Sequence, residues 1–112
     1  MQHGSAIDRV HLDAQTFGDR ALADELLGLF AGQCRSLSAR ISDAAASPAE
    51  RADAAHTLKG SALGVGAGAV AETASRIEDG LRRGGPLEPA DLATLAAAVA
   101  AALAEIEGSR RG

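Results

Sequence analysis

Aromatic residues are almost absent from this sequence, which has two Phe and no Trp or Tyr among 112 residues. Strand-rich sandwiches and barrels are filled largely by aromatic and β-branched side chains, so this composition excludes them. Alanine supplies 27 positions instead, and alanine and leucine favour helices. The chain is also short enough to be one domain. The composition therefore predicts a single all-α domain.

Cysteine is equally scarce, and neither sign of charge dominates. Cys34 is the only cysteine, which leaves no internal disulfide and no zinc-site spacing. Eleven basic against fifteen acidic residues give a net charge of −4, which argues against nucleic acid as a partner. The most apolar stretch, residues 92–103, is about 12 residues long and too short to span a bilayer. Residues 1–5 lack the features of a signal peptide. We expect a soluble, cytoplasmic chain with no membrane partner.

Helix-starting and helix-ending residues divide the chain into five segments. We predict helices over residues 8–16, 19–45, 48 to the glycine cluster at 64–68, 67–83 and 88–107. Ser47 is the expected N-cap of the third segment, with Pro48 and Glu50 in its first turn. Four long segments with short connections predict an antiparallel, up-and-down four-helix bundle with a possible short N-terminal helix. Residues 1–112 then form one domain, with frayed ends at 1–7 and 108–112.

The third segment carries a histidine on the side opposite its apolar stripe. Ala55, Leu58, Ala62 and Val65 form that stripe, and His56 lies about 140° from its centre at 100° per residue. A lone exposed histidine is most often a solvated surface residue. Its neighbours therefore decide whether His56 has a function.

Those neighbours suit a docked anionic partner. Gly60 in mid-helix costs about 1 kcal/mol relative to alanine, which close approach of another molecule explains. Leu63 adds exposed apolar surface, and Ala52 lies one turn before His56. Lys59 supplies a positive charge that favours an anion on the imidazole. We predict that His56 accepts an anionic group while a partner docks over Ala52, Gly60 and Leu63.

Phosphoryl transfer is the reaction that fits this arrangement. A neutral imidazole is a nucleophile, and a hydrogen bond to one ring nitrogen fixes the tautomer in which the other attacks. The transfer needs mainly in-line positioning and charge neutralisation. Lys59 is expected to supply part of that neutralisation.

The twelve residues 56–67 closely resemble the phosphorylation motif of histidine-containing phosphotransfer (HPt) domains. They place Leu, Lys and Gly at positions +2, +3 and +4 from His56, a small residue at +5, and Gly-Ala at +10 and +11. The resemblance implies a multistep His–Asp phosphorelay, in which His56 carries a phosphoryl group between aspartates of response-regulator receiver domains. Lys59 would neutralise the phosphoryl oxygens, and Gly60 would admit the receiver.

The resemblance also implies what the chain does without. The receiver would bring the Mg²⁺, so we expect no cofactor and no metal site in this chain. We expect a monomeric phosphocarrier rather than an enzyme, with a hybrid histidine kinase as a further possible partner. Autophosphorylation from ATP is not expected, because 112 residues leave no room for an ATP-binding domain.

Four other polar residues have a structural interpretation, and two of them also have a functional one. Gln33 falls in line with Leu26, Phe30 and Leu37, and either is satisfied by backbone or reaches the imidazole or phosphoryl group of His56. Ser61 either packs as a small residue or supports the phosphoryl site. Arg76 and Arg82 are expected to be solvated. Arg76 is also expected to pair with Glu72, four residues before it on the helix.

Two alternatives belong to other classes. One is a non-catalytic helical-bundle interaction module that docks a receiver or signalling partner. The presence of His56, Lys59 and Gly60 together favours the phosphocarrier over it. The other is a metal-binding bundle, which would need inward-facing Glu-x-x-His pairs that the sequence lacks.

Overall fold

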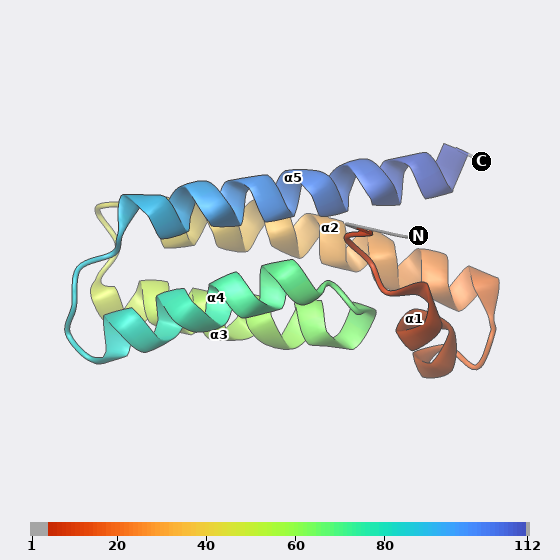
Figure 1. Ribbon diagram of the computed structural model, residues 1–112, viewed down its shortest axis with the longest axis horizontal. Coiled ribbons are helices and arrows are strands. Elements are labelled where there is room, and N and C mark those ends of the chain that lie inside the picture. Colours follow the sequence, from red (N-terminus) through yellow and green to blue (C-terminus); the bar gives the residue numbers. More distant parts are fainter. Residues whose placement is uncertain (1–4, 112) are drawn as a thin grey trace.

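The computed structural model describes residues 5–111, with side chains through residue 109, and these residues form five helices and no strand (Figure 1). This confirms the predicted all-α class. The helices are α1 (Arg9–Gln15), α2 (Arg20–Ser42), α3 (Pro48–Val65), α4 (Gly68–Arg82) and α5 (Pro89–Arg111). Most ends fall within three residues of the predicted segments; the C-terminal end of α5 lies further out.

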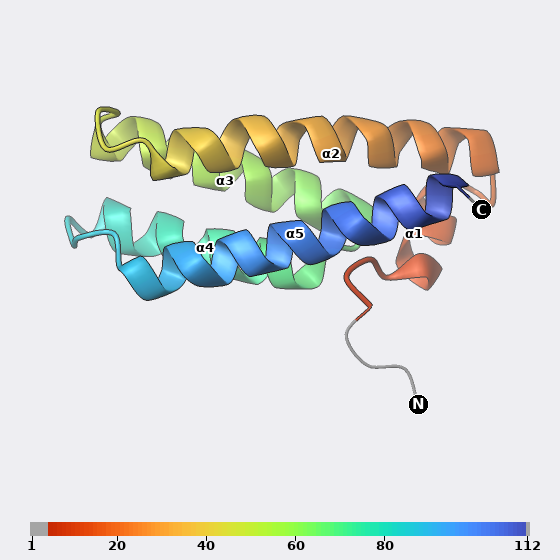
Figure 2. The same ribbon diagram turned by 90° about the horizontal axis from the view of Figure 1, so that it is seen from above.

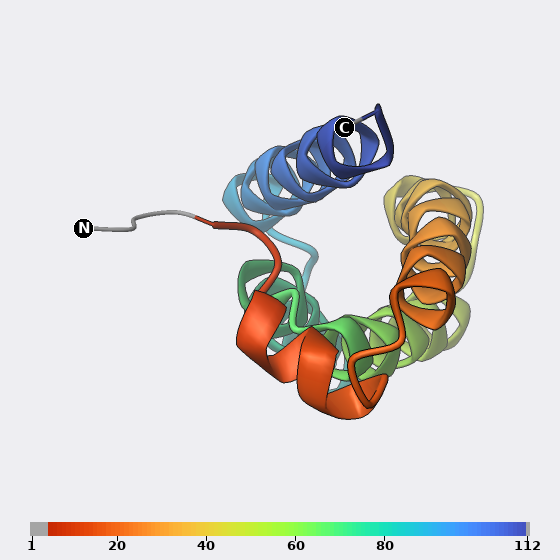
Figure 3. The ribbon, with the colours of Figure 1, turned by 90° about the vertical axis from the view of Figure 1, so that its right-hand side faces the viewer.

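The four long helices are arranged around a common core, and their chain directions alternate along the long axis (Figure 1). The end-on view in Figure 3 shows α3 between α2 and α4, and Figure 2 shows α5 inclined to the other long helices. α3 packs against both α2 and α4, and α5 packs against the same two helices. α3 therefore has neighbours on two sides and a solvent-facing outer surface.

Side-chain caps fix where α1, α2 and α3 begin. The Oγ atom of Ser47 accepts a hydrogen bond from the N–H of Glu50 at 3.1 Å, and the Glu50 carboxylate accepts from the N–H of Ser47 at 2.9 Å. This capping box confirms Ser47 as the N-cap of α3. Asp8 and Asp19 cap α1 and α2 in a similar way.

Gly66 ends α3 in the left-handed conformation, with φ of +82°. The N–H of Asp8 donates to the Gly66 carbonyl at 2.9 Å, and a Cβ atom at position 66 would lie only 2.9 Å from the Asp8 carbonyl oxygen. Both the backbone conformation and this close approach require glycine. The turn directs the chain back into α4 and anchors the start of α1.

The predicted stripe of α3 is buried throughout, because Ala55, Leu58, Ala62 and Val65 all belong to the core. On α2 the apolar stripe is rotated from the predicted one. Phe30 is buried, but Leu26 and Leu37 only pack partly against the core, and Leu27 and Cys34 are fully buried instead. α2 contacts both α3 and α5, so its buried face lies between the two.

The chain ends are more ordered than expected within the described residues. Ile7 is fully buried, and its N–H donates to a carboxylate oxygen of Glu105 at 2.8 Å. The hydroxyl of Ser5 also donates to Glu105, at 2.9 Å. Residues 5–7, which were expected to fray, therefore pack against α5, and residues 108–111, also expected to fray, continue α5. Residues 1–4 and 112 of the expected frayed ends lie outside the described part.

α5 is long and apolar enough, by length and composition, to cross a membrane. The segment Pro89–Ser109 has 21 residues, and the mean hydropathy of its most apolar window is 1.5. The expectation that its apolar stretch is too short is therefore wrong for the helix as a whole. Only 22% of the most apolar window is buried, but that window includes core residues such as Leu95, Val99 and Ala102. Core helices of soluble bundles meet the same two criteria, so length and composition do not distinguish them.

Candidate functional site

His56 lies on the solvent-facing surface of α3, and its side chain is 63% exposed. Its neighbours in sequence, Ala55 and Leu58, are fully buried. Helical geometry separates these directions, because 100° per residue turns position 56 away from the stripe. The structure therefore confirms the predicted orientation of His56.

The residues around His56 are exposed or buried according to the side of α3 on which they lie. Gly60 is exposed and a Cβ atom there would meet nothing within 4 Å, and Leu63 is 56% exposed. Ala52 is only 1% exposed, so its predicted part in docking is wrong. Four residues of helix turn about 400°, which leaves a net rotation of about 40°. Ala52 precedes His56 by four residues and is rotated toward α4, whereas Gly60 follows His56 by four residues and is rotated away from α4. Lys59 is turned toward α4 as well and is half-buried.

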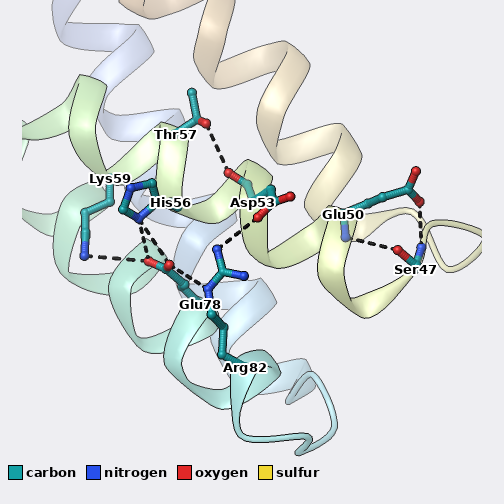
Figure 4. Close-up of polar contacts among 8 residues, drawn as sticks. All are labelled: Ser47, Glu50, Asp53, His56, Thr57, Lys59, Glu78 and Arg82. Carbon is teal, nitrogen blue, oxygen red and sulfur yellow. Dashed lines mark hydrogen bonds and ion pairs between the residues drawn. The ribbon is translucent and has the colours of Figure 1, made fainter.

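A carboxylate from α4 contacts the imidazole (Figure 4). The Nδ1 atom of His56 lies 3.2 Å from Oε1 and 3.1 Å from Oε2 of Glu78. The side chain of Glu78 is only 10% exposed, so the contact is held at the α3–α4 boundary. Among the described residues Nε2, the other ring nitrogen, has no hydrogen bond or ion pair.

The ionisation of Glu78 fixes the direction of this hydrogen bond. Burial alone would raise the pKa of Glu78, but hydrogen bonds from Arg82 and His56 and the charge of Lys59 outweigh burial and lower it. Glu78 is therefore ionised near neutral pH and can only accept. Nδ1 of His56 must then carry the proton, and the neutral ring has its lone pair on Nε2.

Two cations complete the surroundings of Glu78. The Nζ atom of Lys59 lies 3.6 Å from Oε1, and the Nε of Arg82 donates to Oε2 at 2.9 Å. Arg82 also donates through Nη2 to the Asp53 carboxylate at 3.0 Å. The expectation that Arg82 is simply solvated is therefore wrong, although its side chain is 45% exposed.

Three other polar residues were singled out in the sequence. Nη1 of Arg76 lies 3.9 Å from Oε1 of Glu72, as predicted, and its Nε lies 3.6 Å from Oδ1 of Asp91. Gln33 is exposed rather than buried on the apolar stripe, and within residues 5–109 it forms no hydrogen bond with His56, whose Nδ1 is bonded to α4 instead. Ser61 is half-buried and lies about 140° around α3 from His56, on the side away from the imidazole.

Sequence reasoning missed Glu78 and Asp53. Glu78 is 22 residues from His56 in the chain, and only the antiparallel packing of α4 on α3 brings it to the ring. The available signal was weak: Glu78 and Arg82 form an i, i+4 pair on an otherwise apolar face.

The arrangement can perform nucleophilic chemistry at one atom. The site presents a largely exposed imidazole, a proton held on Nδ1 by a carboxylate, and a lysine one turn along the helix. Within the part of the chain that the structure describes, no group of three or more His, Cys, Asp or Glu side chains is placed to hold a metal ion. These features fit acceptance of an electrophilic, anionic group.

The family comparison agrees with this geometry. The family model described as "Hpt domain" matches residues 25–107, which span most of α2 through α5. No curated protein and no solved structure matches the chain. Hpt domains take part in phosphorelays of two-component signalling as soluble phosphocarriers, and they interact with receiver domains and histidine kinases. The match covers well over half of the 112 residues, and the chain therefore belongs to the Hpt domain family.

Proposed function

We propose that this protein is the histidine phosphotransfer component of a multistep His–Asp relay, with His56 as its phosphoacceptor. The observation that carries the proposal is the hydrogen bond between Nδ1 of His56 and the ionised Glu78, with the imidazole 63% exposed. This contact selects the tautomer whose free lone pair, on Nε2, points outward. An exposed nucleophilic nitrogen suits attack on a group presented by another protein.

The proposed step is a direct exchange of bonds at phosphorus. The Nε2 lone pair attacks the phosphorus of an aspartyl phosphate on a receiver domain, an N–P bond forms, and the P–O bond to the aspartate breaks. The aspartate leaves as a carboxylate, and the proton on Nδ1 stays in place. The ring gains positive charge during attack, which the Glu78 carboxylate stabilises. Attack by a second aspartate carboxylate reverses the exchange and releases the phosphoryl group to another receiver.

The neighbouring residues have supporting roles in this proposal. Lys59 lies one turn after His56 on α3, and its Nζ is 3.6 Å from Oε1 of Glu78, the carboxylate bonded to the ring. Its charge would neutralise part of the charge on the phosphoryl oxygens. Gly60 and Leu63 would lie under the docked receiver. The receiver would contribute the Mg²⁺, and this chain would need no cofactor of its own. Ser61 and Gln33 are not included in the proposed site.

The proposal also covers the form of the domain. We propose a single, monomeric, cytoplasmic domain with an up-and-down four-helix bundle and no autokinase activity. The alternating directions of α2–α5 and the contact of α5 with both α2 and α4 support the bundle. Light scattering after size exclusion measures the oligomeric state directly.

The test is transfer from receiver domains charged with radiolabelled acetyl phosphate. We expect a charged receiver to label the wild-type protein in an acid-labile, base-stable form, and His56→Gln to remain unlabelled. His11→Gln is the matched control and should be labelled normally, because His11 lies on α1. Label that persists on His56→Gln contradicts the assignment. A receiver that binds tightly without any transfer supports the interaction-module alternative instead.

A further inference from the structure

The guanidinium of Arg82 joins two carboxylates that belong to different helices (Figure 4). Its Nε donates to Glu78 at 2.9 Å, four residues earlier on α4, and its Nη2 donates to Asp53 on α3 at 3.0 Å. Glu78 in turn contacts Nδ1 of His56. The four side chains therefore form one continuous chain of hydrogen bonds, from Asp53 through Arg82 and Glu78 to the imidazole.

We infer that Arg82, anchored by Asp53, is a positioning residue that holds the Glu78 carboxylate on Nδ1 of His56. The effect of Arg82 on phosphoryl transfer rests on the proposed function, because the tautomer of His56 affects transfer only if Nε2 is the attacking atom. In the described part of the chain, no hydrogen bond or ion pair joins Arg82 or Asp53 to the imidazole, so both act through Glu78.

Competition for the carboxylate is the reason that Glu78 needs an anchor. The Nζ of Lys59 lies 3.6 Å from Oε1, the oxygen that is 3.2 Å from Nδ1. Lysine is a flexible point charge and imposes no orientation, whereas the planar fork of arginine fixes the direction of each hydrogen bond. The bond from Arg82 Nε to Oε2 therefore holds the carboxylate in place while Lys59 remains free to move.

Asp53 fixes the arginine in the same manner. Arg82 and Asp53 are 45% and 73% exposed, and exposed ion pairs contribute little to the free energy of unfolding. The cross-helix bond instead restricts the rotamers of Arg82, since it fixes Nη2 while Nε bonds to Glu78. The effect of Asp53 is therefore expected on the imidazole tautomer rather than on stability.

The first test measures the tautomer of His56 in the unphosphorylated protein, from the imidazole nitrogen chemical shifts at alkaline pH. We expect the wild type to carry its proton on Nδ1 and Arg82→Gln to shift the majority to the Nε2–H form. Asp53→Asn should give an intermediate population. Arg83→Gln removes the same charge from the next position, which is exposed, and should leave the tautomer unchanged. An unchanged tautomer in Arg82→Gln overturns the inference.

The second test is a double-mutant cycle on the rate of transfer from a charged receiver. We expect Arg82→Gln to slow transfer about tenfold, as loss of an outer partner that orients a histidine does, and Asp53→Asn to slow it less. The double variant should be no slower than Arg82→Gln, because Asp53 acts through Arg82. If the rate losses of the two single variants multiply in the double variant, and both losses shrink at high salt, the two residues act as independent surface charges. This result would contradict the inference.

The two proposals fail in different ways. A wild-type protein that no receiver labels contradicts the proposed function, but the tautomer measurement needs no partner and still decides the role of Arg82. Normal labelling with an unchanged tautomer in Arg82→Gln contradicts only the positioning role. Equal circular dichroism spectra of the variants exclude a loss of helix as the cause.

Discussion

Nδ1 of His56 lies 3.1 Å from Oε2 of Glu78, although the two residues are 22 positions apart and belong to different helices. The contact makes the proposed phosphoacceptor site a two-helix site. α3 supplies the nucleophile and α4 supplies the group that sets its tautomer. Four predictions follow from the positions of individual residues around this pair.

The first concerns Gly60, which lies inside α3 with open space where a Cβ atom would be. Gly60→Ala should raise the free energy of unfolding by about 0.5–1 kcal/mol, since alanine favours helix. Gly60→Gln should slow transfer from a charged receiver strongly and leave helical content intact. Urea denaturation and transfer rates measure the two effects separately.

Gly80→Ala is the matched control for Gly60, because Gly80 lies inside α4 and also has open space at Cβ. It should stabilise the protein to a similar extent without slowing transfer. An unchanged transfer rate in Gly60→Gln would mean that no partner approaches closely at this position.

The second concerns Lys59, whose ammonium is one turn from His56 and half-buried. Lys59→Ala should slow transfer about tenfold, because a hydrogen bond to a charged group contributes roughly 1.5–3 kcal/mol and the receiver's metal carries part of the charge. Lys59→Arg should keep most of the rate. Equal losses in both variants would show that charge at position 59 is not what matters.

The third concerns Leu63, an exposed leucine on the same helix face as His56. Leu63→Lys should weaken binding of the uncharged receiver about tenfold, since it would place an unpaired charge in the buried part of the docked interface. Phosphoramidate, a small phosphoryl donor that needs no docking, should label His56 at the wild-type rate. Calorimetry and labelling kinetics measure the two quantities.

Ala97→Lys is the control for Leu63, because Ala97 is exposed on α5 and outside the proposed docking surface. It should leave receiver binding unchanged. A similar loss of binding in both variants would indicate a general charge effect and not a contact at Leu63.

The fourth concerns the acid limb of stability, measured as the urea midpoint against pH. The pKa of Glu78 in the folded protein lies below its ordinary value of 4.5, because hydrogen bonds from Arg82 and His56 outweigh the effect of burial. A depressed carboxyl pKa stabilises the fold above the unfolded-state pKa, and this contribution is lost as pH falls through the folded-state pKa.

The stability of the wild type relative to Glu78→Gln should therefore fall as pH drops below about 4.5 and be constant above about pH 5.5. Asp79→Asn, next to Glu78 but exposed, provides the control. A constant difference between wild type and Glu78→Gln across the acid range would show that Glu78 titrates alike in both states.

Local sequence rules suffice to predict the helices and the direction of His56. Capping residues such as Ser47 act on their own turn, and the stripe from Ala55 to Val65 follows from 100° per residue, so both are local properties. The same local rule placed Gly60 and Leu63 on the exposed face. It failed for Ala52, because exposure there depends on which side of α3 is covered by α4.

The side chains that meet the imidazole follow from the packing of the helices and not from local sequence. Glu78, Arg82 and Asp53 come together because α4 turns back at Gly66 and packs along α3, and the register of that packing is set by core contacts distributed over both helices. For the same reason Gln33 on α2 was a poor candidate: α2 packs on the opposite side of α3, away from Nδ1. Local sequence fixes the direction in which a helical side chain points, but the packing of helices fixes what it meets.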